Sequence, residues 1–191
     1  MLKANFITAQ EAAEKIQDGS TLCTIGMTLV SASESILKAI EKRFEMVGHP
    51  ADITLVHSCG QSDRKDGIQH LAHEGLVKRI VGSHWGLQPR WMEMIANSQV
   101  EAYCLPQGQI AQLYRSMACG LPGKMSKVGL GTFIDPRVEG GKMNDRTKPL
   151  PDIVDILEYG GEDYMFYKEI PLDTVLIRGT VCDEMGNLTT T

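Results

Sequence analysis

The sequence lacks several patterns that would place it quickly in a class of proteins. No apolar run approaches the roughly 20 residues that a membrane-spanning helix needs. The N-terminus has no apolar core like that of a signal peptide, so we expect a cytoplasmic protein. The five cysteines are scattered and form no C-x-x-C pair, which predicts reduced thiols, with neither a disulfide framework nor a zinc site.

Two catalytic fingerprints are also missing. Gly129-Leu130-Gly131 does not continue into G-x-G-x-x-G, which argues against a nicotinamide-binding Rossmann domain. Ser58, Ser62 and Ser83 stand in no G-x-S-x-G motif, so nothing supports serine hydrolase chemistry.

The composition is that of a globular protein. Apolar residues make up 42% of the 191 residues and charged residues 23%, enough for a sizeable core within one large domain or part of a larger protein. The net charge of −5 argues against nucleic acid or an anionic membrane as a partner. An anionic small molecule held by backbone amides remains compatible with that charge.

Helical and strand patterns alternate over the first two thirds of the chain. We expect strands over 21–25, 53–56, 79–81 and 100–105, and helices over 9–18, 36–47, 89–97 and 109–119. Thr8 with Glu11, and Ser31 with Glu34, match the capping box that begins many helices. This order predicts an α/β fold with an open, mostly parallel, doubly wound sheet.

The last third follows a different pattern. Residues 153–158 and 164–168 flank Gly160-Gly161 and predict a β-hairpin. Residues 174–177 form an apolar strand, and 188–191 begin a strand with no visible partner. We therefore expect an open sheet edge and self-association or aggregation of the isolated chain. We also expect that the domain is truncated, or that its missing half is supplied separately.

A glycine run near the middle of the chain is a candidate ligand site. Residues 127–130 suggest a short strand that leads into Gly129-Leu130-Gly131-Thr132 and the Asp135-Pro136 turn. In an open α/β sheet, ligands bind where parallel strands end. The alternative is a purely structural turn.

The histidines offer weaker candidates. His70 and His73 are three residues apart, but no third ligand has zinc-type spacing, so we predict no metal site. The pair His84-Trp85 stands between glycines after a strand, where it either lines a cleft or packs through the tryptophan.

The sequence resembles the N-terminal half of family I coenzyme A transferases, most closely the acetate/propionate type, over essentially its whole length. The resemblance rests on segments in a shared order and spacing: Ala72-His73-Glu74-Gly75-Leu76, Gly82-Ser83-His84-Trp85-Gly86, Pro106-Gln107-Gly108, the run from Gly129 to Arg137, Gly140-Gly141-Lys142-Met143-Asn144, Leu176-Ile177-Arg178-Gly179-Thr180, and Asp183-Glu184-Met185-Gly186-Asn187-Leu188. It implies an α/β sheet fold shared with sugar-phosphate isomerases and a homo-oligomeric protein.

The resemblance also implies ping-pong transfer of coenzyme A between an acyl-CoA and a short carboxylic acid, through a glutamyl-CoA thioester. Coenzyme A is then a substrate, and no other cofactor is implied. The family's nucleophilic glutamate lies beyond the end of this chain, so we assign no catalytic residue here. We interpret Glu34 as a capping residue and Glu101 as an exposed strand residue, while Glu74 matches a segment away from the nucleophile.

The resemblance assigns substrate contacts to this half. Gln107, followed by Gly108, matches the family's substrate-side glutamine, although a plain turn glutamine is the alternative. Gly26 and Met27 match the start of a glycine turn, but Leu29 and Ser33 depart from the family pattern. Gly131 and Thr132, in the central glycine run, complete the expected substrate-binding set.

Two other functions remain open at this stage. The chain is compatible with a non-catalytic domain that binds a small acid or a partner protein. It is also compatible, by fold analogy alone, with a sugar-phosphate isomerase or an effector-binding domain.

Overall fold

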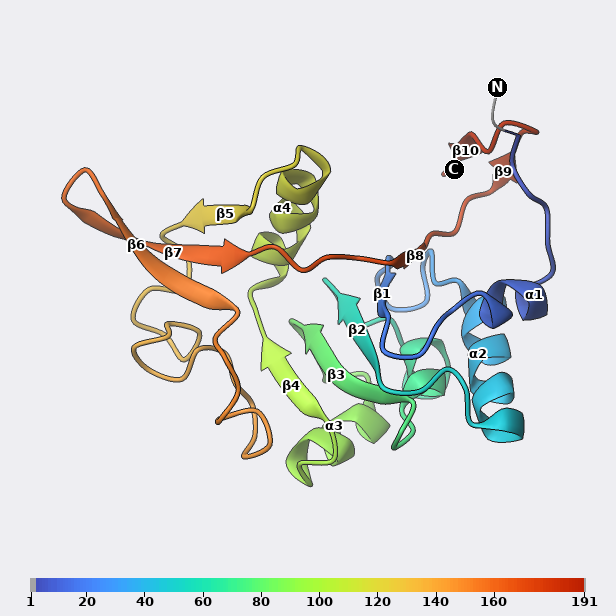
Figure 1. The fold of residues 1–191 in the computed structure, drawn as a ribbon, viewed down its shortest axis with the longest axis horizontal. Coiled ribbons are helices and arrows are strands. Elements are labelled where there is room, and N and C mark those ends of the chain that lie inside the picture. The colour runs from blue at the N-terminus through green and yellow to red at the C-terminus, as the bar shows by residue number, and fades with distance from the viewer. Residues whose placement is uncertain (1–2, 191) are drawn as a thin grey trace.

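A five-stranded parallel sheet forms the centre of the protein, whose computed structural model describes residues 3–190 (Figure 1). The strands are β1 (Thr21–Thr24), β2 (Ile53–His57), β3 (Val77–Gly82), β4 (Glu101–Cys104) and β8 (Thr174–Leu176). Their order is β4-β3-β2-β1-β8, and every pairing is parallel. Successive strands therefore progress in one direction from β1 to β4, while β8 adds on the other side of β1.

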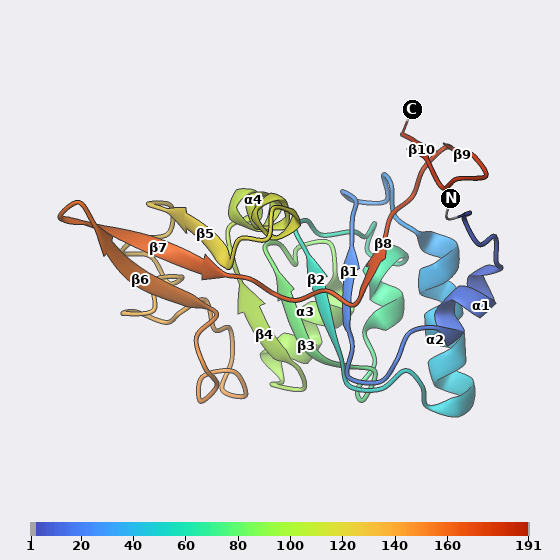
Figure 2. The ribbon, with the colours of Figure 1, turned by 45° about the horizontal axis from the view of Figure 1, so that its top comes forward.

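Helices and loops cover both faces of this sheet. The helices are α1 (Ala9–Glu14), α2 (Glu34–Val47), α3 (Pro89–Ala96) and α4 (Gln107–Ala118), with a 3₁₀ turn η1 (Gly67–Leu71). Leu22, Leu55 and Ile80 point into one core with α1, α2, α3 and η1, whereas Cys23 and Val56 point into a second core with α4. The segment between β7 and β8 crosses this second face, where Ile170 and Leu172 pack (Figure 2). The α/β, doubly wound, mostly parallel prediction is confirmed.

The two predicted capping boxes have different outcomes. Thr8 and Glu11 form the box: Thr8 Oγ1 accepts from Glu11 N at 3.2 Å, and Glu11 Oε2 accepts from Thr8 N at 2.7 Å. The helix that they begin ends at Glu14, four residues before its predicted end. The box of Ser31 and Glu34 is wrong, because Ser33 is the N-cap and makes no side-chain capping bond. The Glu34 carboxylate instead accepts from Gly67 N at 2.9 Å, a tertiary partner that replaces the local one.

A second, antiparallel sheet of three strands lies beside the first. Its strands are β5 (Gly123–Ser126), β6 (Val154–Tyr159) and β7 (Glu162–Lys168), in the order β5-β7-β6. The predicted hairpin is confirmed: β6 and β7 pair around Gly160 and Gly161, whose φ angles of 64° and 79° suit a tight two-residue turn. Figure 1 shows this hairpin projecting from the end of the molecule opposite α1 and α2.

The short strand predicted over 127–130 is wrong. The strand β5 lies earlier and pairs antiparallel with β7, and residues 128–130 form a turn. A Cβ atom at Gly123 would lie 2.3 Å from the carbonyl oxygen of Tyr167, so this glycine permits the close strand pairing. The central glycine run therefore does not follow a parallel strand.

The unpaired strand expected at the end of the chain is also corrected. Within the described residues, β10 (Leu188–Thr189) pairs antiparallel with β9 (Val181–Cys182), and Thr191 lies outside them. Asp183 organises the connecting turn by accepting from Met185 N and Asn187 N, each at 2.9 Å. The outermost strand of the parallel sheet on this side is β8. The Ala4 N–H donates to Glu184 O at 3.0 Å, which places the two ends of the described chain side by side (Figure 1).

The expectation that Glu101 is exposed is wrong. Its exposed fraction is 6%, and its carboxylate accepts from Arg79 Nε at 2.7 Å across the β3–β4 pair. The paired guanidinium compensates for burial of the charge. Over residues 3–190, no helix is both long enough and apolar enough to cross a membrane.

Candidate functional site

The carboxyl edge of the parallel sheet gathers the loops that follow β1, β2, β3 and β4. These loops span residues 25–33, 58–66, 83–88 and 105–106. The strands β2, β3 and β4 are added on one side of β1 and β8 on the other, so the order of the strands changes side between β1 and β8. In open α/β sheets, this edge and this change of side are where ligands bind. Gly26, Met27, Gln107 and Gly108 all lie at this edge.

Hydrogen bonds connect the first three of these loops and the end of β4 into one unit. Thr28 N donates to Gly60 O at 3.1 Å, which joins the loop after β1 to the loop after β2. Gln61 Nε2 donates to Thr24 O at 2.7 Å and adds a second link between the same two regions. Ser83 Oγ donates to Ser58 O, which joins the loop after β3 to the loop after β2. Cys104 Sγ, at the end of β4, donates to Ser83 O at 3.6 Å.

Gly26 and Met27 begin a tight turn. Gly26 has a φ of 153°, and a Cβ atom there would lie 2.8 Å from Val30 O, so a larger residue does not fit this turn. Met27 and Val30 exchange both backbone hydrogen bonds, at 3.0 and 2.9 Å. The turn leaves the Met27 side chain 58% exposed at the edge.

Gln107 and Gly108 are the first two residues of α4, directly after the β4 loop. Both are exposed, and the Gln107 side chain makes no hydrogen bond to any residue between 3 and 190. The first N–H groups of a helix have no earlier helical carbonyl to bond to. A Cβ atom at Gly108 would meet nothing within 4 Å. This corner therefore presents a free carboxamide and free backbone donors.

Gly131 and Thr132 lie in the turn between β5 and β6, and their polar groups are used inside that turn. Gly131 N donates to Asp135 Oδ2 at 2.9 Å, and Thr132 Oγ1 donates to Gly129 O at 2.7 Å. The Asp135 carboxylate is 1% exposed, and its hydrogen bonds with Arg137 hold its pKa well below the ordinary range. In the described part of the chain, no hydrogen bond connects Gly131 or Thr132 to Met27 or Gln107.

A buried polar layer beneath the edge was missed by the sequence analysis. It consists of side chains at or after the ends of β1, β2 and β3, each with a buried polar atom that has no partner among the described residues: Thr24, His57, Gln61, Trp85 and Gln88. The sequence carries one signal for it, since apolar strands end in Thr24 and His57 where a further apolar residue would continue the core. Trp85 packs in the core as expected, while His84 beside it is exposed.

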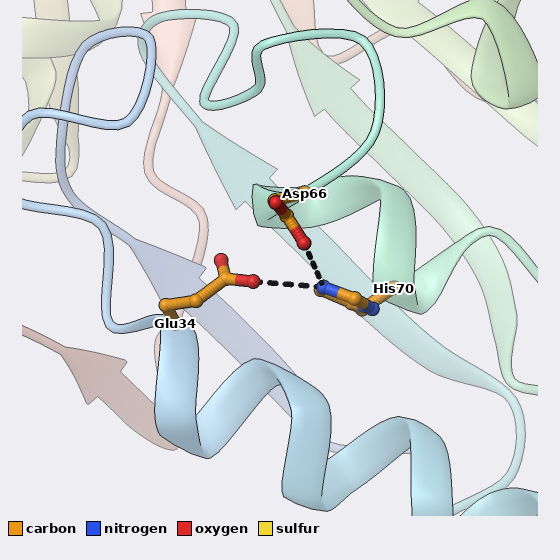
Figure 3. Close-up of side chains that lie close together, drawn as sticks. All are labelled: Glu34, Asp66 and His70. Carbon is orange, nitrogen blue, oxygen red and sulfur yellow. Dashed lines mark hydrogen bonds and ion pairs between the residues drawn. The ribbon is translucent and has the colours of Figure 1, made fainter.

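A second polar cluster joins α2 to η1 (Figure 3). His70 Nε2 lies 2.8 Å from Glu34 Oε1 and 3.3 Å from Asp66 Oδ1, and His70 Nδ1 contacts Glu41. His73 Nε2 lies 2.9 Å from Glu41 Oε1. The tertiary structure thus brings Glu34 and Glu41, which lie far away in the sequence, to the two histidines, while Asp66 is a local neighbour of His70.

The negative charge of these carboxylates is balanced by the protonated His70 ring and by Lys38. Both ring nitrogens of His70 face carboxylates, so both must carry a proton to donate. Burial would lower the pKa of His70, but the bonds to Glu41 and Glu34 outweigh it and raise that pKa. Lys38 Nζ lies 3.1 Å from Glu34 Oε1 and 3.3 Å from Asp66 Oδ1. Ligand atoms of Glu34, Asp66 and His70 lie within 4.8 Å of one another, as in a metal site, but these cations already neutralise the carboxylates.

Comparison with known proteins places the chain in a family. The family model described as coenzyme A transferase matches residues 6–191. Caffeate CoA-transferase of Acetobacterium woodii is 43% identical over 187 residues, which are 97% of this chain and 35% of that protein. Acetate CoA-transferase YdiF of Escherichia coli (strain K12) is 37% identical over 96% of this chain and 34% of its own length. The chain therefore spans about a third of the length of these relatives.

Solved structures agree with the sequence comparisons. The apoenzyme of the acyl-CoA transferase YdiF from Escherichia coli O157:H7 superimposes with a TM-score of 0.94 and 35% identity, over 98% of this chain and 36% of that one. The glutaconate coenzyme A-transferase of Acidaminococcus fermentans, at 16% identity and a TM-score of 0.71, shares the fold. The predicted resemblance is confirmed, and the chain belongs to the coenzyme A transferase family.

Proposed function

We propose that this chain is the acceptor-acid side of an enzyme that transfers coenzyme A from a short-chain acyl-CoA to a carboxylic acid. The observation that carries the proposal is the corner at the carboxyl edge, where the free Gln107 carboxamide and the first N–H groups of α4 lie beside the linked loops. Such donors suit a carboxylate or an oxyanion, and the relatives with the same fold are named CoA-transferases.

The proposed chemistry uses a glutamate outside this chain. Its carboxylate attacks the acyl-CoA thioester, which forms an acyl-glutamyl anhydride and releases the CoA thiolate. The thiolate then attacks the glutamyl carbonyl, which forms a glutamyl-CoA thioester and releases the first carboxylate. An acceptor carboxylate reverses both steps and leaves as the new acyl-CoA.

The three glutamates considered from the sequence support an external nucleophile. Glu34 is held by Gly67 N, His70 and Lys38. Glu101 begins β4, at the amino end of the sheet, and is paired with Arg79. Glu74 precedes β3 and so also lies towards the amino end.

In this proposal the chain's own residues bind and orient the acid. Gln107 Nε2 donates to the acceptor carboxylate or to the oxyanion that develops during attack, and a positioned donor of this kind contributes about 3 kcal/mol to the transition state. Gly26 and Met27 border the same edge, and Gly131 with Thr132 shape the turn after β5. The relatives' names suggest substrates from acetate to caffeate, and we propose acetyl-, propionyl- and butyryl-CoA as donors.

The test is CoA exchange in the complete enzyme that contains this chain. We expect acetate-dependent consumption of propionyl-CoA or butyryl-CoA, with parallel-line ping-pong kinetics and a covalent CoA adduct when acyl-CoA is added alone. We expect no turnover from the 191-residue chain by itself. Turnover by that chain would contradict the external nucleophile, and acid binding without transfer in the complete protein would favour a non-catalytic acid-binding domain. Sedimentation of the complete enzyme tests the proposed homo-oligomer.

A further inference from the structure

His57 is a fully buried histidine directly beneath the candidate site. It is the last residue of β2, has an exposed fraction of 0%, and is the β1-register partner of Thr24. The next three residues, 58–60, form the loop that the hydrogen bonds described above connect to its neighbours. A polar ring at this position ends the apolar strand just below the carboxyl edge.

The hydrogen bond of His57 defines its tautomer. Nδ1 lies 2.9 Å from Cys59 O, and because a carbonyl only accepts, Nδ1 carries the proton. Nε2 is then an unprotonated nitrogen with no partner among residues 3–190. Burial lowers the pKa of His57 to about 4, so the ring is neutral at neutral pH.

The residues around the imidazole ring of His57 leave room for it and fix its orientation. A Cβ atom at Gly82 would lie 2.5 Å from His57 Cε1 and 2.6 Å from Nε2, so only glycine at position 82 leaves room. Trp85 packs edge-on against the ring, with centroids 4.9 Å apart and an interplanar angle of 88°. Two strands and a loop therefore fix the orientation of one imidazole.

The loop held by His57 supports the Gly26–Met27 turn. The three carbonyls of this loop are each committed: Ser58 O accepts from Ser83 Oγ, Cys59 O from His57 Nδ1, and Gly60 O from Thr28 N. Thr28 is the residue after Met27. If the Cys59 carbonyl changes direction, the neighbouring Gly60 carbonyl moves with it. That movement disturbs the Gly60–Thr28 bond and therefore the turn.

We propose that His57 is a positioning residue whose Nδ1–H holds the loop after β2 and, through the Gly60–Thr28 bond, sets the Gly26–Met27 turn against bound substrate. The effect on substrate rests on the proposed CoA transfer, whereas the effect on the loop does not. His57 touches no reacting atom in this proposal.

The test compares variants that keep or remove the donor. His57→Asn retains an N–H near the position of Nδ1, whereas His57→Gln places its amide further along and His57→Leu has no donor. The first readout is amide hydrogen exchange at Thr28 in the complete enzyme. We expect Thr28 to exchange about tenfold faster in His57→Leu and His57→Gln, with Asn within about threefold of wild type, as for loss of one buried hydrogen bond.

The second readout is the kinetics of the complete enzyme. We expect KM for the acceptor acid to rise about tenfold in the Leu and Gln variants, with a smaller change in kcat and with rescue by Asn. Gly82→Ala displaces the ring, so we expect it to change Thr28 exchange and KM as His57→Leu does. His49→Leu is the matched control, since His49 is exposed and bonds to Asp18 away from this edge.

The outcomes separate the two proposals. Unchanged exchange at Thr28 in His57→Leu, or in His57→Gln if the leucine variant does not fold, overturns the positioning role. Equal damage from Asn and Gln also overturns it, because the hydrogen bond is then irrelevant. Absence of CoA transfer in the wild-type enzyme contradicts the proposed function, while the exchange result still decides the role of His57 in the loop.

Discussion

Two glycine-containing regions in this protein were both expected to contact substrate but use their polar groups differently. At the carboxyl edge of the parallel sheet, the Gly26 turn and the start of α4 leave an exposed methionine, a free carboxamide and free helix N–H groups. In the turn after β5, the buried Asp135 carboxylate accepts from Gly131 N and Arg137, and Thr132 bonds to Gly129. Glycine content alone does not show whether a turn keeps polar groups free for a ligand. The hydrogen bonds of those groups do.

The largest expected effect on activity comes from substitution of Gln107. Gln107→Ala in the complete enzyme should reduce kcat/KM for transfer by roughly tenfold to a thousandfold, because a positioned donor is lost. Stability should stay within about 0.5 kcal/mol, because the side chain is exposed and unbonded. Steady-state kinetics and urea unfolding measure the two quantities.

Glu74→Gln is the control for that measurement. Glu74 is exposed near the amino end of the sheet, so transfer should change less than about twofold. If Glu74→Gln abolishes transfer while Gln107→Ala leaves it intact, the assignment of the pocket is wrong. Joint loss of activity and stability in Gln107→Ala would make it a turn residue.

The opposite pattern is expected at Asp135. Asp135→Ala removes the acceptor for Gly131 N, Arg137 N and the Arg137 guanidinium, and should lower the free energy of unfolding by about 2 kcal/mol. Because the pKa of Asp135 is depressed, its contribution is complete above the unfolded pKa of about 3.9 and is lost progressively as the pH falls from there through the folded value. Urea titrations at pH 7 and pH 3 test both statements. A fully stable variant with impaired substrate binding would place this turn in the site instead.

A pair of glycine substitutions sharpens the comparison. Gly26→Ala should destabilise by about 2 kcal/mol, because its Cβ would meet Val30 O at 2.8 Å. Gly131→Ala should cost about 1 kcal/mol, since its φ of 70° disfavours alanine but nothing lies within 4 Å of the new Cβ. Thermal unfolding of both variants shows which substitution destabilises the protein more. The reverse order would contradict the described geometry of the Gly26 turn.

The smallest effect concerns pH and His70. Because its folded pKa is raised above the unfolded value of about 6.5, its contribution to stability is complete below that pH and is lost as the pH rises through the folded pKa. We expect the free energy of unfolding to fall as the pH rises from 6 to 9, and His70→Gln to flatten this dependence. An unchanged slope in His70→Gln would show that another group titrates.

Local patterns in the sequence predicted most elements. The hydrophobic periodicity of α2, Pro89 at the first turn of α3, the Thr8–Glu11 box and the Gly160-Gly161 turn each depend on neighbours in the chain, and each was confirmed. Three of the errors share one cause. Glu34, Glu101 and Gly123 are governed by Gly67, Arg79 and Tyr167, partners 22 or more residues away that periodicity and capping rules do not reveal.

The sequence by itself determined the family, the alternation of strands and helices, and the place of Gln107 between a strand and a helix, because motif spacing, apolar periodicity and turn residues are properties of the chain. The tertiary structure alone decided which turns keep free donors, why His57 and Gly82 fit together, and how His70 comes to lie against Glu34 and Glu41. The physical reason is that burial and hydrogen-bond partnership depend on which distant segments pack together, and only packing decides whether a polar group is already satisfied.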